Sequence, residues 1–172
     1  PRPRVRARTG ADRPTMLLFV GPSAPAALVV PSLLVVEKGA RVMLIERHEG
    51  IAGPDYKVNY AIEVVIGERA HVDHVKIIGE GANALHVSTL MARIGAHARF
   101  NDFTFTTGGA VVRNQLFLRF DGEDTVAGIR GATLLKGRQH VDTTIVADHV
   151  AVGCQSRELF KSVLDDDSRG VF

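Results

Sequence analysis

The chain has 172 residues, which suits a single domain with a substantial buried core. Charged residues make up 23% of it and the formal net charge is +2, too small a charge to indicate a nucleic-acid partner. The single cysteine, Cys154, excludes an internal disulfide framework and favours a reducing compartment, so we expect a cytoplasmic protein.

A basic segment precedes an uncharged one at the start of the chain. In residues 1–14 the spacing of Pro and Arg supports no regular element, so we predict a linker or a disordered N-terminal remnant. Residues 16–36 carry no charge, and a transmembrane helix or a signal peptide is an alternative interpretation there. Pro22, Pro25 and Pro31 interrupt this stretch and leave only short apolar runs. We therefore predict two buried strands and no membrane association.

Nine glycines recur at nearly constant steps along the rest of the chain. The steps between them are 14 residues five times in succession, followed by 13, 15 and 16. A fixed period indicates a repeat architecture, with glycine supplying unusual backbone angles at the turns. The glycines are Gly39, Gly53, Gly67, Gly81, Gly95, Gly109, Gly122, Gly137 and Gly153.

The segments between these glycines are rich in β-branched and aromatic residues, as strands are. Because side chains alternate along a strand, an even step keeps the same positions facing inward in every repeat. Two such columns are mostly apolar: Val42, Tyr56, Ala70, Ala84, Ala98 and Val112, and then Leu44, Val58, Val72, His86, Phe100 and Asn114. We predict an all-β fold over residues 15–172, a parallel β-helix (β-solenoid) with half-coils of about 14 residues. A sandwich of short strands is the alternative.

Two histidine-containing segments invite a metal interpretation. The segment HVDH invites a metal interpretation with Asp73, but His71 and His74 are three residues apart and would face opposite sides of a strand, so their two imidazoles cannot converge locally. Cys154 and His149 are candidate ligands for a soft metal, although a free cysteine is often only a small buried apolar residue. We expect the polar members of the inward columns, His86 and Asn114, to be hydrogen-bonded core residues.

The acidic run at residues 165–167 resembles the carboxylate clusters with which β-helix polysaccharide lyases hold calcium. Arg157, Lys161 and Arg169 surround the run, which fits a solvated turn better. No nucleophile elbow, phosphate-binding loop or zinc-protease motif is present. We therefore expect no enzymatic activity, with a β-helix carbohydrate-active enzyme as the alternative.

Three stretches of the chain resemble the SufB/SufD family of iron–sulfur cluster assembly proteins. The last of them, SRELFKSVLDDDSRGVF, is the most specific and is closer to the SufD branch than to SufB. The stretches GRQHVDTTIVADH and EKGARVMLIE resemble earlier coils of the same family. The resemblance covers residues 15–172 and implies a right-handed parallel β-helix, in which the final stretch is one more coil instead of a tail. The helical domains that flank the family's core are not visible here.

The resemblance implies a non-catalytic scaffold subunit that pairs with a SufB-like paralogue and a SufC-like ABC-type ATPase. The ATPase would bind through parts that are absent here, and a self-associating structural solenoid or homodimer is the alternative. Since clusters usually take about four thiolate ligands, we expect no cofactor on this chain alone and a cluster only at a shared interface. Exposed strand edges pair readily with another chain, which makes the following residues our candidate interface: Arg157, Phe160, Lys161, Val171 and Phe172.

Overall fold

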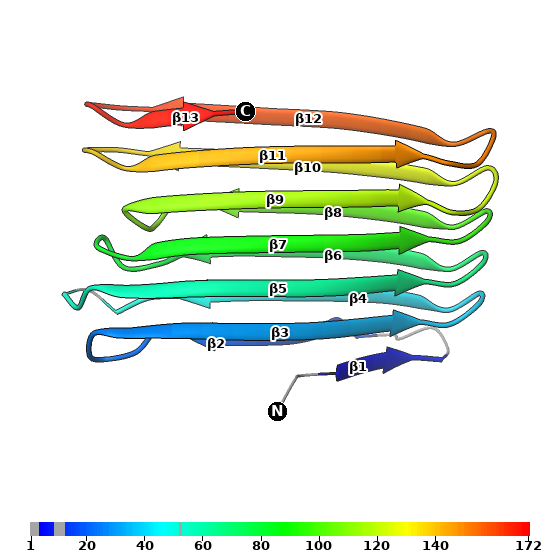
Figure 1. The fold of residues 1–172 in the computed structure, drawn as a ribbon, viewed down its shortest axis with the longest axis horizontal. Helices are drawn as coiled ribbons and strands as arrows, with labels where there is room; N and C mark the ends of the chain where they lie inside the picture. Colours follow the sequence, from blue (N-terminus) through cyan, green and yellow to red (C-terminus); the bar gives the residue numbers. More distant parts are fainter. Residues whose placement is uncertain (1–3, 9–12, 52) are drawn as a thin grey trace.

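The computed structural model describes residues 4–8, 13–51 and 53–172, and all of its regular elements are strands (Figure 1). In chain order they are Arg4–Ala7 (β1), Thr15–Val20 (β2), Ala26–Val36 (β3), Arg41–Glu49 (β4), Tyr56–Ile66 (β5), His71–Gly79 (β6), Leu85–Ile94 (β7), Arg99–Thr106 (β8), Val111–Phe120 (β9), Val126–Leu135 (β10), His140–His149 (β11), Gln155–Leu164 (β12) and Arg169–Val171 (β13).

The strands form two parallel sheets that face each other, with the chain crossing between them at every turn (Figure 1). Sheet A has the order β1-β3-β5-β7-β9-β11-β13 and sheet B the order β12-β10-β8-β6-β4-β2. Each strand pairs in parallel with the strand two further along, so Val72 lies beside Phe100, one coil of 28 residues later. The predicted β-solenoid is confirmed, and the sandwich alternative is wrong because no pair of strands in the described residues is antiparallel.

The two inward-facing columns that we predicted from the regular spacing of the glycines form the core. All twelve residues of the two columns are buried, including the polar His86 and Asn114. Burial alternates strictly along β5 and β6, as expected for strands with one face inward. At about 25 cal/mol per Å² of apolar area, the stacked interior is the main stabilising contribution, and no single coil could bury it alone.

The nine regularly spaced glycines have one of two structural roles at the corners between strands. Some, including Gly39, Gly137 and Gly153, have the positive φ that we expected of all of them. Other glycines of this series lie where the backbones of two successive coils touch and leave no room for a side chain. A Cβ atom added at Gly122, for example, would lie 2.0 Å from the Ala96 nitrogen. The expectation of unusual backbone angles was therefore wrong for this second group, in which the coil spacing excludes a side chain.

Hydrogen bonds between backbones also link the corners of successive coils. The Arg69 nitrogen donates to the Ala96 oxygen at 2.8 Å, and the His97 nitrogen donates to the Glu123 oxygen at 2.8 Å. Both donors belong to residues with positive φ, 56° in each case. The corners therefore keep the strict stacking that the strands set up, even where the turn residue is not glycine.

The N-terminal part differs from the sequence expectation. Arg4–Ala7, which we expected to form no element, is a strand that pairs in parallel with residues 33–36 of β3. Residues 1–3 and 9–12 of the predicted linker lie outside the described residues. The uncharged stretch does form two strands, β2 and β3, but they are only half-buried, because Met16 and Val29 on their outer faces are exposed. Within the described ranges, the structure holds no helix that is long and apolar enough to cross a membrane.

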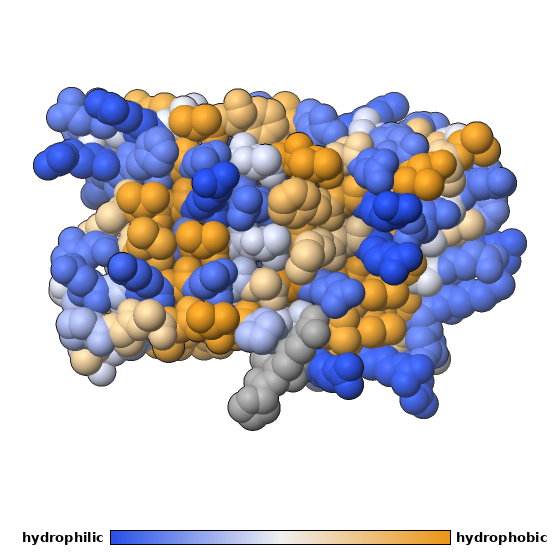
Figure 2. Space-filling view, in the orientation of Figure 1, coloured by the Kyte–Doolittle hydropathy of each residue, from blue (hydrophilic) through white to orange (hydrophobic). Residues whose placement is uncertain are grey.

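The end of the chain forms strands as predicted: β12 pairs with β10, and β13 pairs with β11. Figure 2 shows apolar side chains gathered over the middle of the face that sheet A presents to solvent. One column on this face runs across three neighbouring strands, from Met91 to Phe117 to Val146. The outer surface is therefore not uniformly polar.

Candidate functional site

The interior is polar where β4, β6 and β8 of sheet B face β5, β7 and β9 of sheet A. Buried polar groups are stable only when they have partners, so each of them needs an account. We call these residues the interior polar cluster: Glu46, His48, Tyr56, Tyr60, His74, Lys76, Glu80, His86, Ser88, Asp102, Thr104 and Asn114.

One half of the interior polar cluster is a line of alternating charge across sheet B. His74 Nδ1 donates to Asp102 Oδ1 at 2.6 Å, and His74 Nε2 lies 3.3 Å from Glu46 Oε2. Burial alone would lower the pKa of His74, but Glu46 and Asp102 together raise it to about 9. His74 is therefore a protonated imidazolium between two carboxylates at neutral pH.

Three side chains from sheet A and a lysine from sheet B complete this half. Tyr60 donates to Glu46 across the interior, and burial together with the Glu46 charge raises the pKa of the Tyr60 hydroxyl. Lys76 Nζ donates to Ser88 Oγ at 3.0 Å, and Ser88 in turn donates to Asn114 Oδ1 at 2.7 Å. Burial lowers the pKa of Lys76, which Glu46 opposes. Hydrogen bonds thus connect sheet B to sheet A at two places among the described side chains, from Glu46 to Tyr60 and from Lys76 to Ser88.

The other half of the interior polar cluster is built around Glu80, in the turn after β6. Tyr56 donates to Glu80 Oε2 at 2.6 Å and His86 Nδ1 donates to Glu80 Oε1 at 2.9 Å. Burial raises the pKa of Glu80, but the hydrogen bonds from His86 and Tyr56 outweigh burial and lower it. The hydroxyl of Tyr56 also accepts from the Gly81 nitrogen at 2.9 Å, which fixes the turn.

His48, at the end of β4, is the exception among these residues. It is fully buried, yet neither ring nitrogen has a hydrogen-bond partner within the described residues. Its ring stacks on Phe19 at a centroid distance of 4.7 Å and meets His86 edge-on at 4.9 Å. Burial and the neighbouring His86 lower the pKa of His48 to about 3, so the imidazole is neutral.

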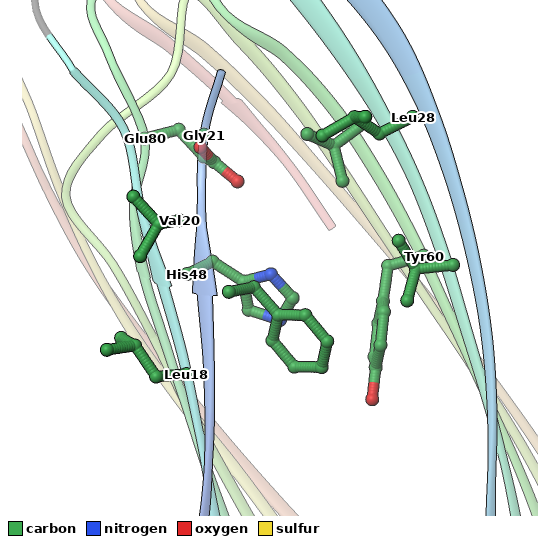
Figure 3. Close-up of a pocket in the computed structure, with 10 residues that line it drawn as sticks. Leu18, Val20, Gly21, Leu28, His48, Tyr60 and Glu80 are labelled. Carbon is green, nitrogen blue, oxygen red and sulfur yellow. The ribbon is translucent and has the colours of Figure 1, made fainter. Parts of the chain in front are cut away.

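A cavity of about 220 Å³ lies beside His48, bounded by β2 on one side and by sheet A on the other. Figure 3 shows His48 and Tyr60 reaching into it from opposite sheets, with Glu80 near Gly21 at one end. Leu18 and Val20 of β2, whose side chains are exposed, form part of its wall. The candidate site thus consists of neutral and charged polar side chains beside this cavity.

Cys154 and His149, the metal-ligand candidates from the sequence, each contact different residues. Cys154 is half-buried, and its sulfur donates to the Gly122 oxygen at 3.2 Å. The His149 ring contacts that of Phe120 in a tilted arrangement, with 4.3 Å between ring centroids, and its Nε2 lies 3.2 Å from Ser156 Oγ. Their role as metal ligands stays a prediction.

The interpretation of the HVDH segment is confirmed. His71 faces outward, with Nε2 3.1 Å from Asp73 Oδ1, whereas His74 faces the interior. The acidic run forms a turn after β12, in which Asp166 Oδ2 accepts from the Gly137 nitrogen at 3.0 Å. Its three aspartates are exposed, as expected of a solvated turn.

The candidate interface residues lie on the last strands of both sheets. Arg157 and Lys161 are exposed on β12 and Val171 is exposed on β13. Phe160 is half-buried and its ring lies 4.6 Å from that of Phe172, which is 72% exposed. The structure therefore brings the two aromatic residues together, and the partner that we predict for them stays a prediction.

The sequence analysis did not identify His48 or Glu80 as members of a site. The signal was nevertheless present, because His48 has the same parity as Leu44 on β4 and Glu80 has the same parity as Ile78. Extending the inward columns by two steps from Leu44 and by four steps from Val72 would have placed both side chains inside. The alternation of side chains along a strand does not predict which interior residues of one sheet contact which residues of the other.

Stacked parallel coils around a filled, partly polar interior define the class of this protein, a β-solenoid core domain. Residues 19–172 match the family described as "SUF system FeS cluster assembly, SufBD core domain". The chain belongs to this SufBD core-domain family. The resemblance noted in the sequence is thereby confirmed.

Several relatives agree with this assignment. A Mycobacterium tuberculosis protein named as an iron–sulfur cluster assembly SufBD family protein is 28% identical over 92% of this chain and 39% of its own length. A Synechocystis protein of the same description is 28% identical over 98% of this chain and 39% of its own. The Escherichia coli iron–sulfur cluster assembly protein SufD is 24% identical, over 81% and 33%. The chain spans about two fifths of the length of the first relatives.

Proposed function

We propose that this chain is the core of a SufD-like scaffold subunit that supports iron–sulfur cluster assembly without catalysing a reaction itself. The observation that carries the proposal is the family match over residues 19–172, which are the coils of the solenoid. Relatives over the same coils, among them the Escherichia coli protein, are named for iron–sulfur cluster assembly. A stack of hydrogen-bonded coils is rigid, which suits a part that positions others.

The proposed partners are a SufB-like paralogue and a SufC-like ATPase in the cytoplasm. Pairing with the paralogue would use the candidate interface on and beside β12 and β13, which includes the apolar residues Phe160, Val171 and Phe172. The ATPase would bind segments outside these 172 residues and supply ATP-driven movement. In this proposal the cluster is assembled at a shared interface with ligands from the partner, and these 172 residues contribute at most one thiol.

Reconstitution tests the scaffold proposal directly. The full-length protein, mixed with the SufB-like and SufC-like proteins of the same organism, is expected to elute as one complex in size-exclusion chromatography with light scattering. Elution of the protein alone would contradict the proposal. A homodimer that excludes both proteins would instead support a self-associating solenoid.

A matched pair of variants tests the candidate interface. We expect Val171→Asp combined with Phe172→Asp to weaken the complex at least about 10-fold, because two charges would be buried against the partner. Val29→Asp places the same change on an exposed residue of β3, and it should leave binding unchanged. Equal binding by both variants, measured by interferometry, would overturn the interface assignment. Circular dichroism confirms that each variant is folded.

A further inference from the structure

Three potential metal ligands converge inside the solenoid from three separate elements. His48 is the second-last residue of β4, Glu80 follows β6 of the next coil, and His86 lies in β7 of sheet A. One ligand atom of each lies within 4.8 Å of the other two. All three side chains are buried, with His48 and His86 fully so. Burying three polar side chains together costs free energy, because each has lost its hydration, unless they find partners in the interior.

The hydrogen bonding leaves this cluster incomplete. Both ring nitrogens of His48 and the Nε2 atom of His86 have no hydrogen-bond partner within the described residues. His86 Nδ1 donates to Glu80 at 2.9 Å, so a metal ion bound between these two side chains would take the place of that hydrogen bond and its proton. An unsatisfied buried polar atom is costly, and an ion bound beside His48 would give one of its two ring nitrogens a partner.

We propose that His48, Glu80 and His86 bind one divalent transition-metal ion inside the solenoid, with a further coordination position facing the adjacent cavity. Two imidazoles and one carboxylate suit Zn²⁺, Fe²⁺ or Co²⁺, whereas Ca²⁺ and Mg²⁺ prefer sets of oxygen ligands. The cavity of about 220 Å³ that His48 and Glu80 line has room for water or a small ligand on the metal.

The present spacing of the three side chains is wider than a coordination sphere requires, since one ligand atom of each lies within 4.8 Å of the other two. Metal–nitrogen bonds of 2.0–2.1 Å place tetrahedral ligand atoms about 3.4 Å apart, so the three side chains would move inward on binding. The ion would then tie sheet A to sheet B at this coil.

Titration of the full-length, tag-free protein with Co²⁺ after chelator treatment tests the site. We expect one equivalent to bind and to give visible d–d absorption typical of nitrogen and oxygen ligands. A thiolate-to-metal charge-transfer band would overturn the proposal, because none of the three proposed ligands is a thiolate. Zn²⁺ at about 100 times its Kd should raise Tm by roughly 5 °C or more.

Two variants and a control separate this site from metal binding by surface histidines. His48→Phe keeps an aromatic ring and removes the two unpartnered nitrogens, so it should abolish the Zn²⁺-induced rise in Tm while the metal-free protein stays at least as stable. His86→Gln should weaken Co²⁺ binding by at least about 10-fold. His71→Gln, which removes an outward-facing histidine beside Asp73, should change neither measurement.

The outcomes are decisive in both directions. Loss of Co²⁺ absorption in both site variants, together with its retention in His71→Gln, supports the proposal. Absence of one-equivalent binding in the wild-type protein overturns it, as does unchanged binding in His86→Gln. If His48→Phe fails to fold, His86→Gln alone decides, because its own metal-free Tm shows whether that variant is intact.

Discussion

Gly122→Ala is expected to destabilise the protein by about 3 kcal/mol or more, a large effect for the addition of one methyl group. The new Cβ atom would lie 2.0 Å from the Ala96 nitrogen and 2.4 Å from the Ala96 Cα atom. Both obstacles are backbone atoms of the preceding coil, so no side-chain rotation can relieve the contact. The coils would have to separate locally, which would disturb the hydrogen bonds at the same corner.

Gly137→Ala is the matched control for this change. Gly137 has a φ of +62° but nothing within 4 Å of an added Cβ atom, so only the left-handed backbone is penalised, by about 1–2 kcal/mol. Urea unfolding followed by circular dichroism gives both free energies of unfolding. Equal costs for the two variants would show that backbone angle, and not coil spacing, selects glycine at these corners.

Asp102→Asn is expected to destabilise the protein by roughly 3 kcal/mol at pH 6, because it removes one partner of a buried ion pair. Asp102 accepts from His74 at 2.6 Å, and both side chains are almost fully buried. The variant keeps the size of the side chain and removes its charge. The imidazolium of His74 would then have Glu46 as its remaining carboxylate partner.

The cost of Asp102→Asn should depend on pH with a definite sign. The pKa of His74 is about 9 in the folded protein and 6.5 in its ordinary state, so its stabilisation is complete below pH 6.5 and is lost as pH rises through about 9. The difference in unfolding free energy between wild type and variant should therefore fall to about 1 kcal/mol at pH 10, the value of a neutral hydrogen bond.

Asp121→Asn provides the comparison at the surface. Asp121 bonds Arg93 and Arg119, whose side chains are more than half exposed, and such ion pairs contribute about 0–1 kcal/mol. Its cost should be small and constant between pH 6 and pH 10. An equally small, pH-independent cost for Asp102→Asn would mean that His74 is neutral in the folded protein.

The repeat architecture was predictable because it depends on parity and period alone. An even step between glycines placed Val42, Tyr56 and Ala70 inside, and all three are buried. The contacts within the interior polar cluster were not predictable, because they join residues whose register is fixed only when two sheets close on each other. Tyr60 and Glu46, for example, belong to opposite sheets, and no local pattern connects them.

Non-local pairing also explains what was missed near the N-terminus. Arg4–Ala7 has no strand-like composition, and it is extended because residues 33–36 offer a parallel edge. Pro31 lies inside β3, where a proline argues against a strand. Among the described residues, Pro31 pairs with Ala61 of β5, and the pairing of β1 with β3 covers Leu33 to Val36.

The stacking of equivalent positions one coil apart limits how the molecule can change in length. Val72 and Phe100 occupy the same place in successive windings, 28 residues apart. Removing or duplicating a segment of that size would return each later residue to its own sheet and orientation, whereas half of it would exchange the two sheets. Viable insertions and deletions in this fold should therefore come in whole windings, with intermediate sizes confined to the corners.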